Sequence, residues 1–503
     1  MRAYFASSIG AACTAALVLP TLAPQASAAS RVPDVPGSTQ SLPLVPLPGQ
    51  ERSAHGAAAR GLPQRETRPF SLVGVVWEDP DSELHASVQV RTRAAGSDAW
   101  SQWQDVENHD AGHAPDPGSP ERASGTVRGA TAPLWVGDSD AVAARVRPEP
   151  APGAPRSATP PLPGGLRLEL VAPGDGQPET SQPGGLRPEV PQPGSPVMPV
   201  PVTPVPVTPV PVMPVPVMPV PLNPALLNPR PERPEIPVPG EGVYEELPGT
   251  VVDPALAASL TPESAAASAV NAGLAPLGAD AILPLTKAET EAQAMAYGFA
   301  KPHIGPRPGI VTRKGWGANE ALREKQFVYT NTVQAAFVHH TATGNRFTCA
   351  QSASVLRSIY RYHVESSGWR DVGYNFAVDK CGNIYEGRAG GVAKPVLGAH
   401  TRGFNTNSMG IAVLGTYSST APPKAAVDAI AKLTAWKLGL FGGNPKSTTY
   451  LTSGGGNRYA KGTKAKLNVI SGHRDGFPTD CPGTLLHGQL GTVRTVAARL
   501  QGR

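Results

Sequence analysis

A proline repeat near the middle of the chain does most to limit the folds that the chain can adopt. From Pro196 to Pro224 the sequence repeats Val-Pro-Val-Thr/Met-Pro, as in Pro201-Val-Thr-Pro-Val-Pro-Val-Thr-Pro209. Proline at every second or third position excludes helices and sheet pairing, so polyproline II is the only good conformer. We therefore expect two folded units, with a rod between them that keeps them apart. An inert spacer is the simplest role for this rod.

The first residues have the features of a secretory signal peptide. Arg2 precedes an apolar run from Ala11 to Leu22, and Ala26-Ser-Ala28 is a small-residue cleavage site. The apolar run contains a proline and is too short to span a bilayer, and no later segment has the pattern of a membrane span. We therefore expect a secreted protein, extracellular or associated with the cell wall, without stable membrane insertion.

Composition divides the chain into six segments. The chain contains 58 prolines and 54 glycines, which are high numbers, and aromatic residues make up only 6% of it. Much of the chain therefore cannot build a core. The expected segments are a signal peptide (1–28), a disordered lead-in (29–67), a β-sandwich accessory domain (68–175), a Pro-rich linker with Val-Pro repeats (176–248), an Ala-rich, partly ordered connector (249–307) and a compact C-terminal domain (308–503).

The segment 68–175 alternates apolar and polar side chains, as half-buried antiparallel strands do. We expect strands over residues 70–77, 86–93, 100–106, 132–136, 141–146 and 166–171. The segment also holds four tryptophans, and a core role explains them better than a ligand platform does. They are Trp77, Trp100, Trp103 and Trp135.

The C-terminal domain alternates strand patterns with helix patterns. Strands are expected over residues 333–340, 374–378, 384–386, 409–414 and 467–470, and helices over 352–364, 425–440 and 490–500. Strands interleaved with helices imply an α/β fold, with helices flanking a mixed sheet.

Two parts of this domain carry side chains that bind metals. His473 and Cys481 lie eight residues apart in a Gly/Pro-rich loop, and imidazole and thiolate are good Zn²⁺ ligands. A surface loop with a disulfide cysteine would explain this segment equally well. The strand from Val333 ends in His339 and His340, at a place where folds often present functional residues. Because neighbouring strand residues face opposite ways, only one of these histidines can serve a given site.

Cysteine count and charge add two constraints. Cleavage of the signal peptide leaves Cys349, Cys381 and Cys481, and an oxidising compartment favours one disulfide and one thiol with another role. The C-terminal unit is basic and the N-terminal unit is acidic. A basic secreted unit favours an anionic cell-wall polymer as partner, and secretion argues against nucleic acid. A solvated surface that aids solubility is the plain alternative.

Seven motifs in the C-terminal domain occur in the order of a known family. They are Trp316-Gly-Ala, Phe337-Val-His-His-Thr-Ala, Gly368-Trp-Arg-Asp-Val-Gly-Tyr-Asn-Phe, Glu386-Gly-Arg, Gly398-Ala-His, Asn405-Thr-Asn-Ser-Met-Gly-Ile and Ser471-Gly-His-Arg-Asp…Cys481-Pro-Gly. Over about residues 308–490 the chain resembles the peptidoglycan recognition proteins, which share their fold with the phage-lysozyme-type zinc amidases. The N-terminal β unit resembles the domain that precedes the amidase domain in secreted actinobacterial members.

This resemblance implies an N-acetylmuramoyl-L-alanine amidase, a zinc hydrolase that cuts the amide between the lactyl group of muramic acid and the L-alanine of the stem peptide. By position it implies that His339, His473 and Cys481 bind Zn²⁺ and that Tyr374 is catalytic. Thr479 stands where the phage enzymes carry a catalytic lysine, so it is a weaker candidate for a catalytic role. Three protein ligands leave a fourth tetrahedral position for water, which is the pattern of a catalytic zinc site.

The resemblance also implies how substrate is held. The matching substrate-binding positions are His363, Trp369, His400 and Asn405, and His400 is our candidate for protonating the leaving amine. A disulfide between Cys349 and Cys381 is implied by the same family. The expected partners are peptidoglycan and muropeptides. A recognition protein that binds muropeptides without cutting them is the main alternative, but in this family it goes with loss of the cysteine ligand. A purely structural spacer of the cell wall is the third.

Overall fold

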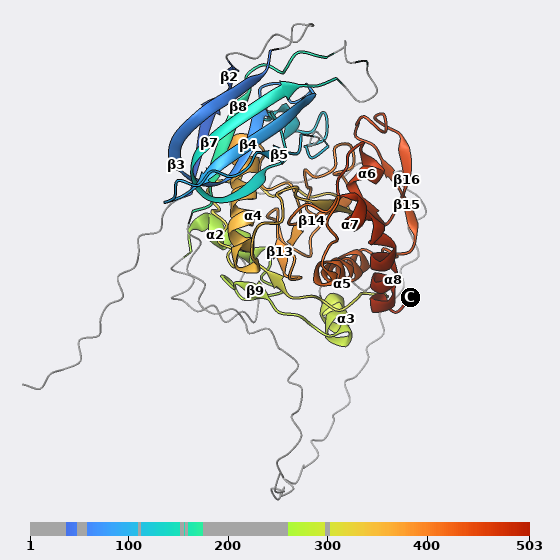
Figure 1. Ribbon diagram of the computed structural model, residues 1–503. Helices are drawn as coiled ribbons and strands as arrows, with labels where there is room; N and C mark the ends of the chain where they lie inside the picture. Colours follow the sequence, from blue (N-terminus) through green and yellow to red (C-terminus); the bar gives the residue numbers. More distant parts are fainter. Residues whose placement is uncertain are drawn as a thin grey trace, which may run out of the picture.

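Two folded parts, which lie directly against each other, make up the described portion of the chain (Figure 1). This computed structural model describes residues 37–47, 58–108, 112–150, 155, 159–174, 260–296 and 302–503. The expected signal peptide (1–28) and the Pro-rich linker (176–248) lie outside these residues.

The N-terminal part is an antiparallel sheet, as the sequence predicted. Its main strands, in spatial order, are β1 (Ser38–Pro43), β8 (Arg167–Ala172), β3 (Arg60–Trp77), β7 (Leu134–Pro148), β4 (Ala86–Ala94) and β5 (Gln104–Val106), and the short β2 (Val45–Pro46) and β6 (Gly129–Ala130) pair with β3. Irregular register between β3 and β7 bends the sheet. Residues from both of its halves, such as Val75 and Val90, therefore share one core.

The expectation of a disordered lead-in over 29–67 is wrong for the described part of that segment. It contributes β1, β2 and the first residues of β3. Ser38 pairs with Ala172 at the far end of the domain, and Leu44 and Leu62 are buried in its core. Composition could not reveal this order, because the partner strand is supplied by residues far away in the chain.

Two of the four tryptophans are core residues, as expected. Trp77 and Trp135 are buried. Trp100 and Trp103 are only half-buried, and the Arg145 guanidinium lies 4.0 Å from the centre of the Trp103 ring. Trp100 and Trp103 therefore stabilise the outer face of the sheet through cation–π contacts with arginine side chains.

The C-terminal part confirms the predicted mixed sheet with flanking helices. Its strands, in spatial order, are β17 (Ile470–Gly472), β11 (Ala335–His340), β14 (Ser408–Val413), β12 (Phe376–Val378), β13 (Ile384–Glu386), β10 (Ile310–Val311) and β9 (Ala281–Ile282). Strand β11 runs parallel to both of its neighbours, so its carboxyl end lies beside theirs. A separate hairpin pairs β15 (Thr448–Thr452) with β16 (Lys464–Asn468).

Helices cover both faces of this sheet. Val338 and Ile411 face α5 (Lys424–Leu440) and α8 (Leu490–Gln501), which share one core with them. Ala377 and Ala412 face α4 (Ser352–Arg361) on the other side. Since strand neighbours alternate, His339 lies on the α4 side and Val338 on the other.

The expected connector over 249–307 is, where described, an integral part of this domain. It supplies α2 (Pro262–Ala269), the edge strand β9 and α3 (Lys287–Ala296). Pairing of β9 with β10 completes the sheet, which explains why an Ala-rich segment with weak periodicity is ordered. The domain boundary therefore lies before residue 308.

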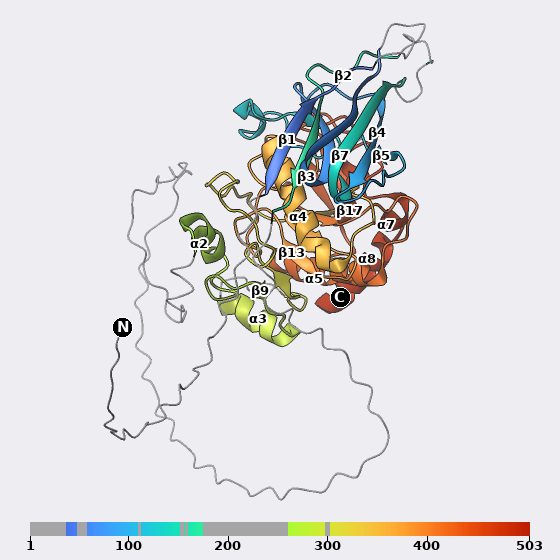
Figure 2. The same cartoon turned by 60° about the vertical axis from the view of Figure 1, so that its left-hand side comes forward.

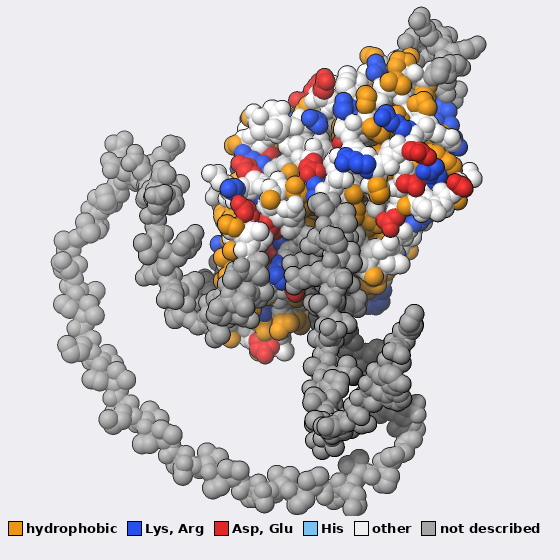
Figure 3. All heavy atoms as spheres, turned by 90° about the vertical axis from the view of Figure 1, so that its left-hand side faces the viewer, with side chains coloured by type: hydrophobic (Ala, Val, Ile, Leu, Met, Phe, Trp, Pro, Cys, Tyr) orange, Lys and Arg blue, Asp and Glu red, His pale blue; other side chains and the backbone are white. Residues whose placement is uncertain are grey.

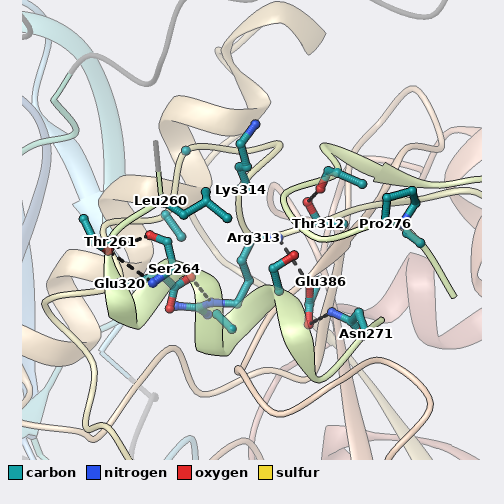
Figure 4. A pocket seen from close by; sticks show the side chains of 16 residues that line it. Leu260, Thr261, Ser264, Asn271, Pro276, Thr312, Arg313, Lys314, Glu320 and Glu386 are labelled. Atoms are coloured by element: carbon teal, nitrogen blue, oxygen red, sulfur yellow. Dashed lines mark hydrogen bonds and ion pairs between the residues drawn. The ribbon is translucent and has the colours of Figure 1, made fainter. Parts of the chain in front are cut away.

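A cavity of about 220 Å³ lies between α2 and the loop that carries Arg313 (Figure 4). Its charged groups bind one another. Arg313 forms ion pairs with Glu320 at 2.7 Å and with Asp371 at 3.1 Å, and Asn271 of the connector donates to Glu386. The Asn271–Glu386 hydrogen bond thus attaches the connector to the rest of the domain beside this cavity.

The two domains are not held apart, so the expected separation by a rod is wrong for the described residues. Leu72, Val76 and Trp135 of the β domain share one core with Ile359 and Tyr362 of the C-terminal domain. Figure 2 shows α4 directly beneath the strands of the β domain. The run from Leu72 to Val76 is apolar on both faces of its strand, because one face contacts the β-domain core and the other contacts α4.

Glycine allows the closest approach of the two domains. A Cβ atom at Gly74 would lie 2.3 Å from the Tyr362 hydroxyl oxygen. That hydroxyl donates to the Thr131 carbonyl of the β domain at 3.1 Å. A side chain at position 74 would therefore push the domains apart.

The outer surface carries mixed charge. On the face shown in Figure 3, Lys and Arg side chains are intermixed with Asp and Glu. Among the described residues, no helix combines the length and the apolar character needed to cross a membrane.

Candidate functional site

Four buried side chains converge at the carboxyl end of β11. They are His113, His339, His473 and Cys481, and their nearest ligand atoms all lie within 4.8 Å of one another. His339 ends β11, His473 begins α6 (His473–Gly476), and Cys481 follows in the next loop. The structure thus brings together the three zinc ligands implied by the sequence. It adds His113, from the β domain, which the sequence did not suggest.

The spacing of these atoms fits a tetrahedral metal site. His113 Nε2 lies 3.0 Å from His339 Nδ1, and Cys481 Sγ lies 3.7 Å from each of these nitrogens. The edges of a zinc tetrahedron measure ~3.3 Å between nitrogens and ~3.6 Å between nitrogen and sulfur. Both ring nitrogens of His473 are buried without a hydrogen bond of normal geometry, although the Gly112 backbone approaches one of them. This donor set can hold a metal ion.

Burial keeps the imidazoles of His339 and His473 neutral, which is the form that binds metals. Burial, followed by the charge of His473, lowers the pKa of His339 well below its usual range. Burial, followed by the charge of His113, does the same to the pKa of His473. The His340 backbone N–H points at Cys481 Sγ from 3.4 Å and stabilises negative charge on the sulfur.

Neighbouring groups fix the orientation of His339. Its Nε2 lies 3.3 Å from His400 Nδ1 and 3.4 Å from Thr401 Oγ1. Burial, helped by the charge of His113, lowers the pKa of His400 to about 3, so this imidazole is neutral as well. A neutral His400 orients the His339 ring through this contact and so affects the cluster of predicted metal ligands.

The turn that carries His473 is fixed by a carboxylate. Asp475 accepts a hydrogen bond from the Gly472 backbone N–H at 2.8 Å, and its other oxygen lies 3.1 Å from His487 Nε2. Asp475 therefore caps the helix that begins at His473 and is not part of the metal cluster.

The two predicted catalytic residues lie in different relations to the cluster. Tyr374 is buried, and its ring centre lies 5.5 Å from that of His339. Thr479 is half-buried and accepts a hydrogen bond from the Cys481 backbone N–H at 3.2 Å. Thr479 therefore contacts the metal ligand loop itself, whereas Tyr374 lies beside the ligands. His340, as alternation predicted, points elsewhere and accepts from the Tyr417 backbone N–H.

The four predicted substrate contacts lie around one place beside the cluster, here called the groove, which residues 112–128 of the β domain occupy. The rings of His363 and Trp369 stack with centres 4.4 Å apart. Asn405 Oδ1 accepts from the backbone N–H groups of His400, at 2.6 Å, and Thr401, at 3.0 Å. Burial, followed by the charge of His113, lowers the pKa of His363. All four residues are buried, and the β domain contacts Asn405 through Ala114 and Trp369 through Val127.

The disulfide implied by the family is present. Cys349 and Cys381 are bonded, with their Cα atoms 6.2 Å apart and a separation of 32 positions in the sequence. Cys349 opens the short helix η2 (Cys349–Gln351), and Cys381 lies in the turn between β12 and β13. Cys481 lies outside this disulfide and is buried in the cluster.

Sequence reasoning missed His113 because it precedes His339 by 226 residues and belongs to the other domain. The only local signal is the glycine before it. A Cβ atom at Gly112 would lie 2.7 Å from His473 Nε2, so this backbone can approach the ligand only without a side chain. A Gly-His pair in a loop is too common to have predicted a metal ligand.

Comparison with known proteins agrees with both domains. A family described as "N-acetylmuramoyl-L-alanine amidase" matches residues 329–484, and one described as "Rv3811 N-terminal galactose-binding domain-like" matches residues 24–164. Peptidoglycan-recognition protein SC2 of Drosophila melanogaster is 30% identical over 183 residues, which is 36% of this chain and 85% of that protein. Human N-acetylmuramoyl-L-alanine amidase is 31% identical over 203 residues, 39% of this chain and 30% of that protein.

Among solved structures, peptidoglycan recognition protein-LE in complex with tracheal cytotoxin is 27% identical, with 36% of this chain and 92% of that chain covered and a TM-score of 0.29. The sequence relatives, the family match and three of the four cluster residues, His339, His473 and Cys481, concern the same domain. This chain belongs to the peptidoglycan-recognition protein and N-acetylmuramoyl-L-alanine amidase family.

Proposed function

We propose that this chain is a secreted zinc hydrolase that cleaves the amide between the lactyl group of N-acetylmuramic acid and the L-alanine of peptidoglycan stem peptides. The observation that carries the proposal is the buried cluster of His339, His473 and Cys481 in a domain that matches the amidase family. Two imidazoles and one thiolate are a donor set typical of Zn²⁺. Secretion rests on the N-terminal signal pattern.

In this proposal His339, His473 and Cys481 hold the zinc. When bound, zinc would act as a Lewis acid, activating water and polarising the scissile carbonyl. The chain holds these ligands in place: Thr401 and His400 orient His339, and the His340 N–H supports the Cys481 sulfur. Neutral ring nitrogens need no proton loss before they bind the ion.

Tyr374 supplies the second catalytic group. Its ring lies beside His339, in a buried position where a phenol O–H can donate to the oxygen on which negative charge develops. One such donor is typically worth about 3 kcal/mol. Thr479 acts as a positioning residue, because its hydroxyl accepts from the Cys481 N–H and so fixes the ligand loop.

A muropeptide-binding protein that does not cut its ligand is the second candidate. The observation that favours it is the fourth side chain in the cluster. Structural zinc sites are closed by four protein ligands, whereas catalytic sites keep one position open. With His113 present, the observed donor set is closed.

Digestion of purified sacculi separates these roles. The zinc-loaded full-length protein is incubated with sacculi in stoichiometric amounts for many hours, so that slow cleavage registers, and products are identified by mass spectrometry. We expect intact stem peptides that begin with free L-alanine, and a loss of at least 10³-fold in Cys481→Ser. The control is His85→Ala, which removes a histidine outside the cluster and should retain cleavage.

Two results would contradict the proposal. Cleavage that is undiminished in Cys481→Ser would remove the metal from the reaction. Sacculi that are bound by the wild type and by every variant of the cluster, His113→Ala included, but never cut would support the binding role.

A further inference from the structure

We propose that residues 112–128 of the β domain, here called the plug, form a built-in inhibitor that fills the substrate groove, with His113 closing the metal site. This inference rests on the proposed function, because it assigns the groove to substrate. The plug runs from the Gly-His pair to the residues just before β6. It contacts the cluster at one end and the predicted substrate residues along its length.

His113 takes the position that a catalytic site leaves open. Its Nε2 lies 3.0 Å from His339 Nδ1 and 3.7 Å from Cys481 Sγ, and its ring centre lies 4.2 Å from that of His473. It also lies against Tyr374, with ring centres 5.6 Å apart. His113 therefore lies against both the predicted catalytic tyrosine and the three predicted ligands, in the space that the scissile amide would need.

The plug backbone next to His113 is held as a bound peptide would be. The Gly112 carbonyl accepts from the Arg402 N–H at 2.8 Å, and the Ala114 carbonyl accepts from Asn405 Nδ2 at 2.9 Å. Asp116 Oδ1 accepts from the same Asn405 amide at 2.6 Å and from the Gly403 N–H at 2.7 Å. Groups of the groove that could bind a peptide ligand are therefore already bound to the chain itself.

A buried ion pair holds the middle of the plug. The Glu121 carboxylate meets the Arg388 guanidinium with two contacts, at 2.8 and 3.0 Å, and accepts from the Arg370 backbone N–H at 3.0 Å. Both side chains are almost fully buried, at 5% and 8% exposure. Removal of one partner would leave a buried charge uncompensated, so Glu121→Gln should weaken docking of the plug.

The last part of the plug covers the predicted aromatic contact. Val127 packs against Trp369, and Thr126 Oγ1 donates to the Gly368 carbonyl at 2.8 Å. The Arg128 N–H donates to the Ser367 carbonyl at 3.0 Å. Asn405, Trp369 and the metal ligands thus all contact the plug, so a muropeptide and the plug cannot occupy the groove at the same time.

The test asks whether the fourth position of the metal opens when the plug is weakened. Cobalt(II) replaces zinc in the full-length protein, and acetohydroxamate, a small metal-binding probe, is titrated while the visible d–d bands are recorded. We expect no spectral change in the wild type at millimolar probe. His113→Ala should show saturable changes at that concentration, and Glu121→Gln, which leaves His113 intact, should show the same changes with weaker apparent affinity.

Controls and a second readout complete the design. His85→Ala is the matched control, because His85 lies in the same domain but pairs with Glu83, and it should behave as the wild type does. Circular dichroism checks that each variant is folded. In the sacculus assay, His113→Ala and Glu121→Gln should release stem peptides at least tenfold faster than the wild type.

The outcomes separate this inference from the proposed function. A wild type that binds acetohydroxamate as well as His113→Ala does would overturn the plug. A fall in cleavage in both variants, when the wild type cleaves, would show that His113 and Glu121 assist the reaction and would overturn it as well. If both variants open to the probe yet no variant cuts sacculi, the plug stands and the amidase proposal fails.

Discussion

The β domain contacts the amidase-like domain through two regions of opposite chemistry. Under α4 the contact is an apolar core, to which the β domain contributes Leu72, Val76 and Trp135. Around the metal site the contact is the plug, which apart from Val127 against Trp369 meets polar side chains and backbone groups and includes one buried ion pair, Glu121 with Arg388. The first resembles the interior of a single domain, and the second resembles a bound ligand.

This difference separates attachment from control. Apolar contacts are non-directional, and opening an apolar core would expose its whole buried surface to water. Such a core therefore stabilises the attachment but makes a poor switch. Polar contacts can exchange with a substrate or with water at little net change in free energy. We infer that the apolar contact keeps the β domain in place while the plug alone leaves the groove.

The strongest test of the attachment role is Trp135→Ala. Trp135 is buried between the domains, and its backbone N–H donates to the Thr343 carbonyl at 3.1 Å. We expect a loss of ~3–5 kcal/mol in the free energy of unfolding, which is typical of a large aromatic removed from a core. Urea unfolding measures it. Trp100→Ala, at the half-buried outer pair, is the control and should lose no more than about 1 kcal/mol. Equal losses would contradict the distinction between these tryptophans.

Metal removal tests whether the ion joins the two domains. Because the cluster takes three side chains from one domain and His113 from the other, zinc should stabilise the docked arrangement. At free zinc about 1,000-fold above Kd we expect a gain of ~4 kcal/mol over the apo protein. In His113→Ala the gain should be smaller at the same zinc concentration. Denaturation with and without a chelator measures both values, and an unchanged gain would place His113 outside the metal site.

Asp116 should make plug docking depend on pH. Burial raises the pKa of Asp116 to about 6. The hydrogen bonds from Gly403 and Asn405 and the charge of Arg402 lower this pKa and so offset part of the rise. Lys461 is a further charged group nearby. The pKa of Asp116 is higher in the docked plug than its usual value of 3.8, so the docked plug holds the proton more tightly. Docking is therefore favoured at low pH and weakens as pH rises through 6. We expect plug opening to increase ten- to hundredfold between pH 4 and pH 7.

Hydrogen exchange of residues 112–126, corrected for intrinsic rates, measures this opening. In Asp116→Asn the amide oxygen can still accept both hydrogen bonds, and the charge is gone. Its opening should therefore vary much less over the same pH range. A variant that follows the wild-type pH profile would assign the dependence to another group.

The smallest effect is expected from Thr479→Ala. Loss of the hydrogen bond to the Cys481 N–H should cost about 1 kcal/mol, seen as a severalfold weaker zinc affinity. Cleavage by the His113→Ala variant should fall by less than tenfold when Thr479→Ala is added. A loss of 10²-fold or more at unchanged zinc affinity would instead show that Thr479 acts directly in catalysis.

Local patterns in the sequence predicted much of the C-terminal domain. The apolar run of β11, its terminal histidine pair and the spacing of His473 and Cys481 are features of neighbouring residues, so they could be recognised without the fold. Alternation along a strand also predicted that His339 and His340 would face opposite ways, as the structure shows. The Cys349–Cys381 disulfide, by contrast, rested on the count of cysteines together with the family resemblance, and the structure contains it.

Contacts between distant segments could not be predicted in this way. His113 reaches His339 because contacts such as those of Tyr362 and Trp135 hold the two domains together. No local sequence pattern encodes this contact between domains. Two signals were nevertheless present. The continuous apolar run from Leu72 to Val76 is typical of a strand buried on both faces. The acidic N-terminal and basic C-terminal units are complementary, and Glu121 with Arg388 is one place where their charges meet.

The shared apolar core has a consequence for how the groove competes for ligands. It holds the plug beside the groove at all times, so the plug acts at a fixed effective concentration that dilution of the protein does not change. A free muropeptide must overcome that local concentration, whereas a polymer that offers many stem peptides at once can do so through avidity. Intact cell wall would then open the groove more readily than its soluble fragments do.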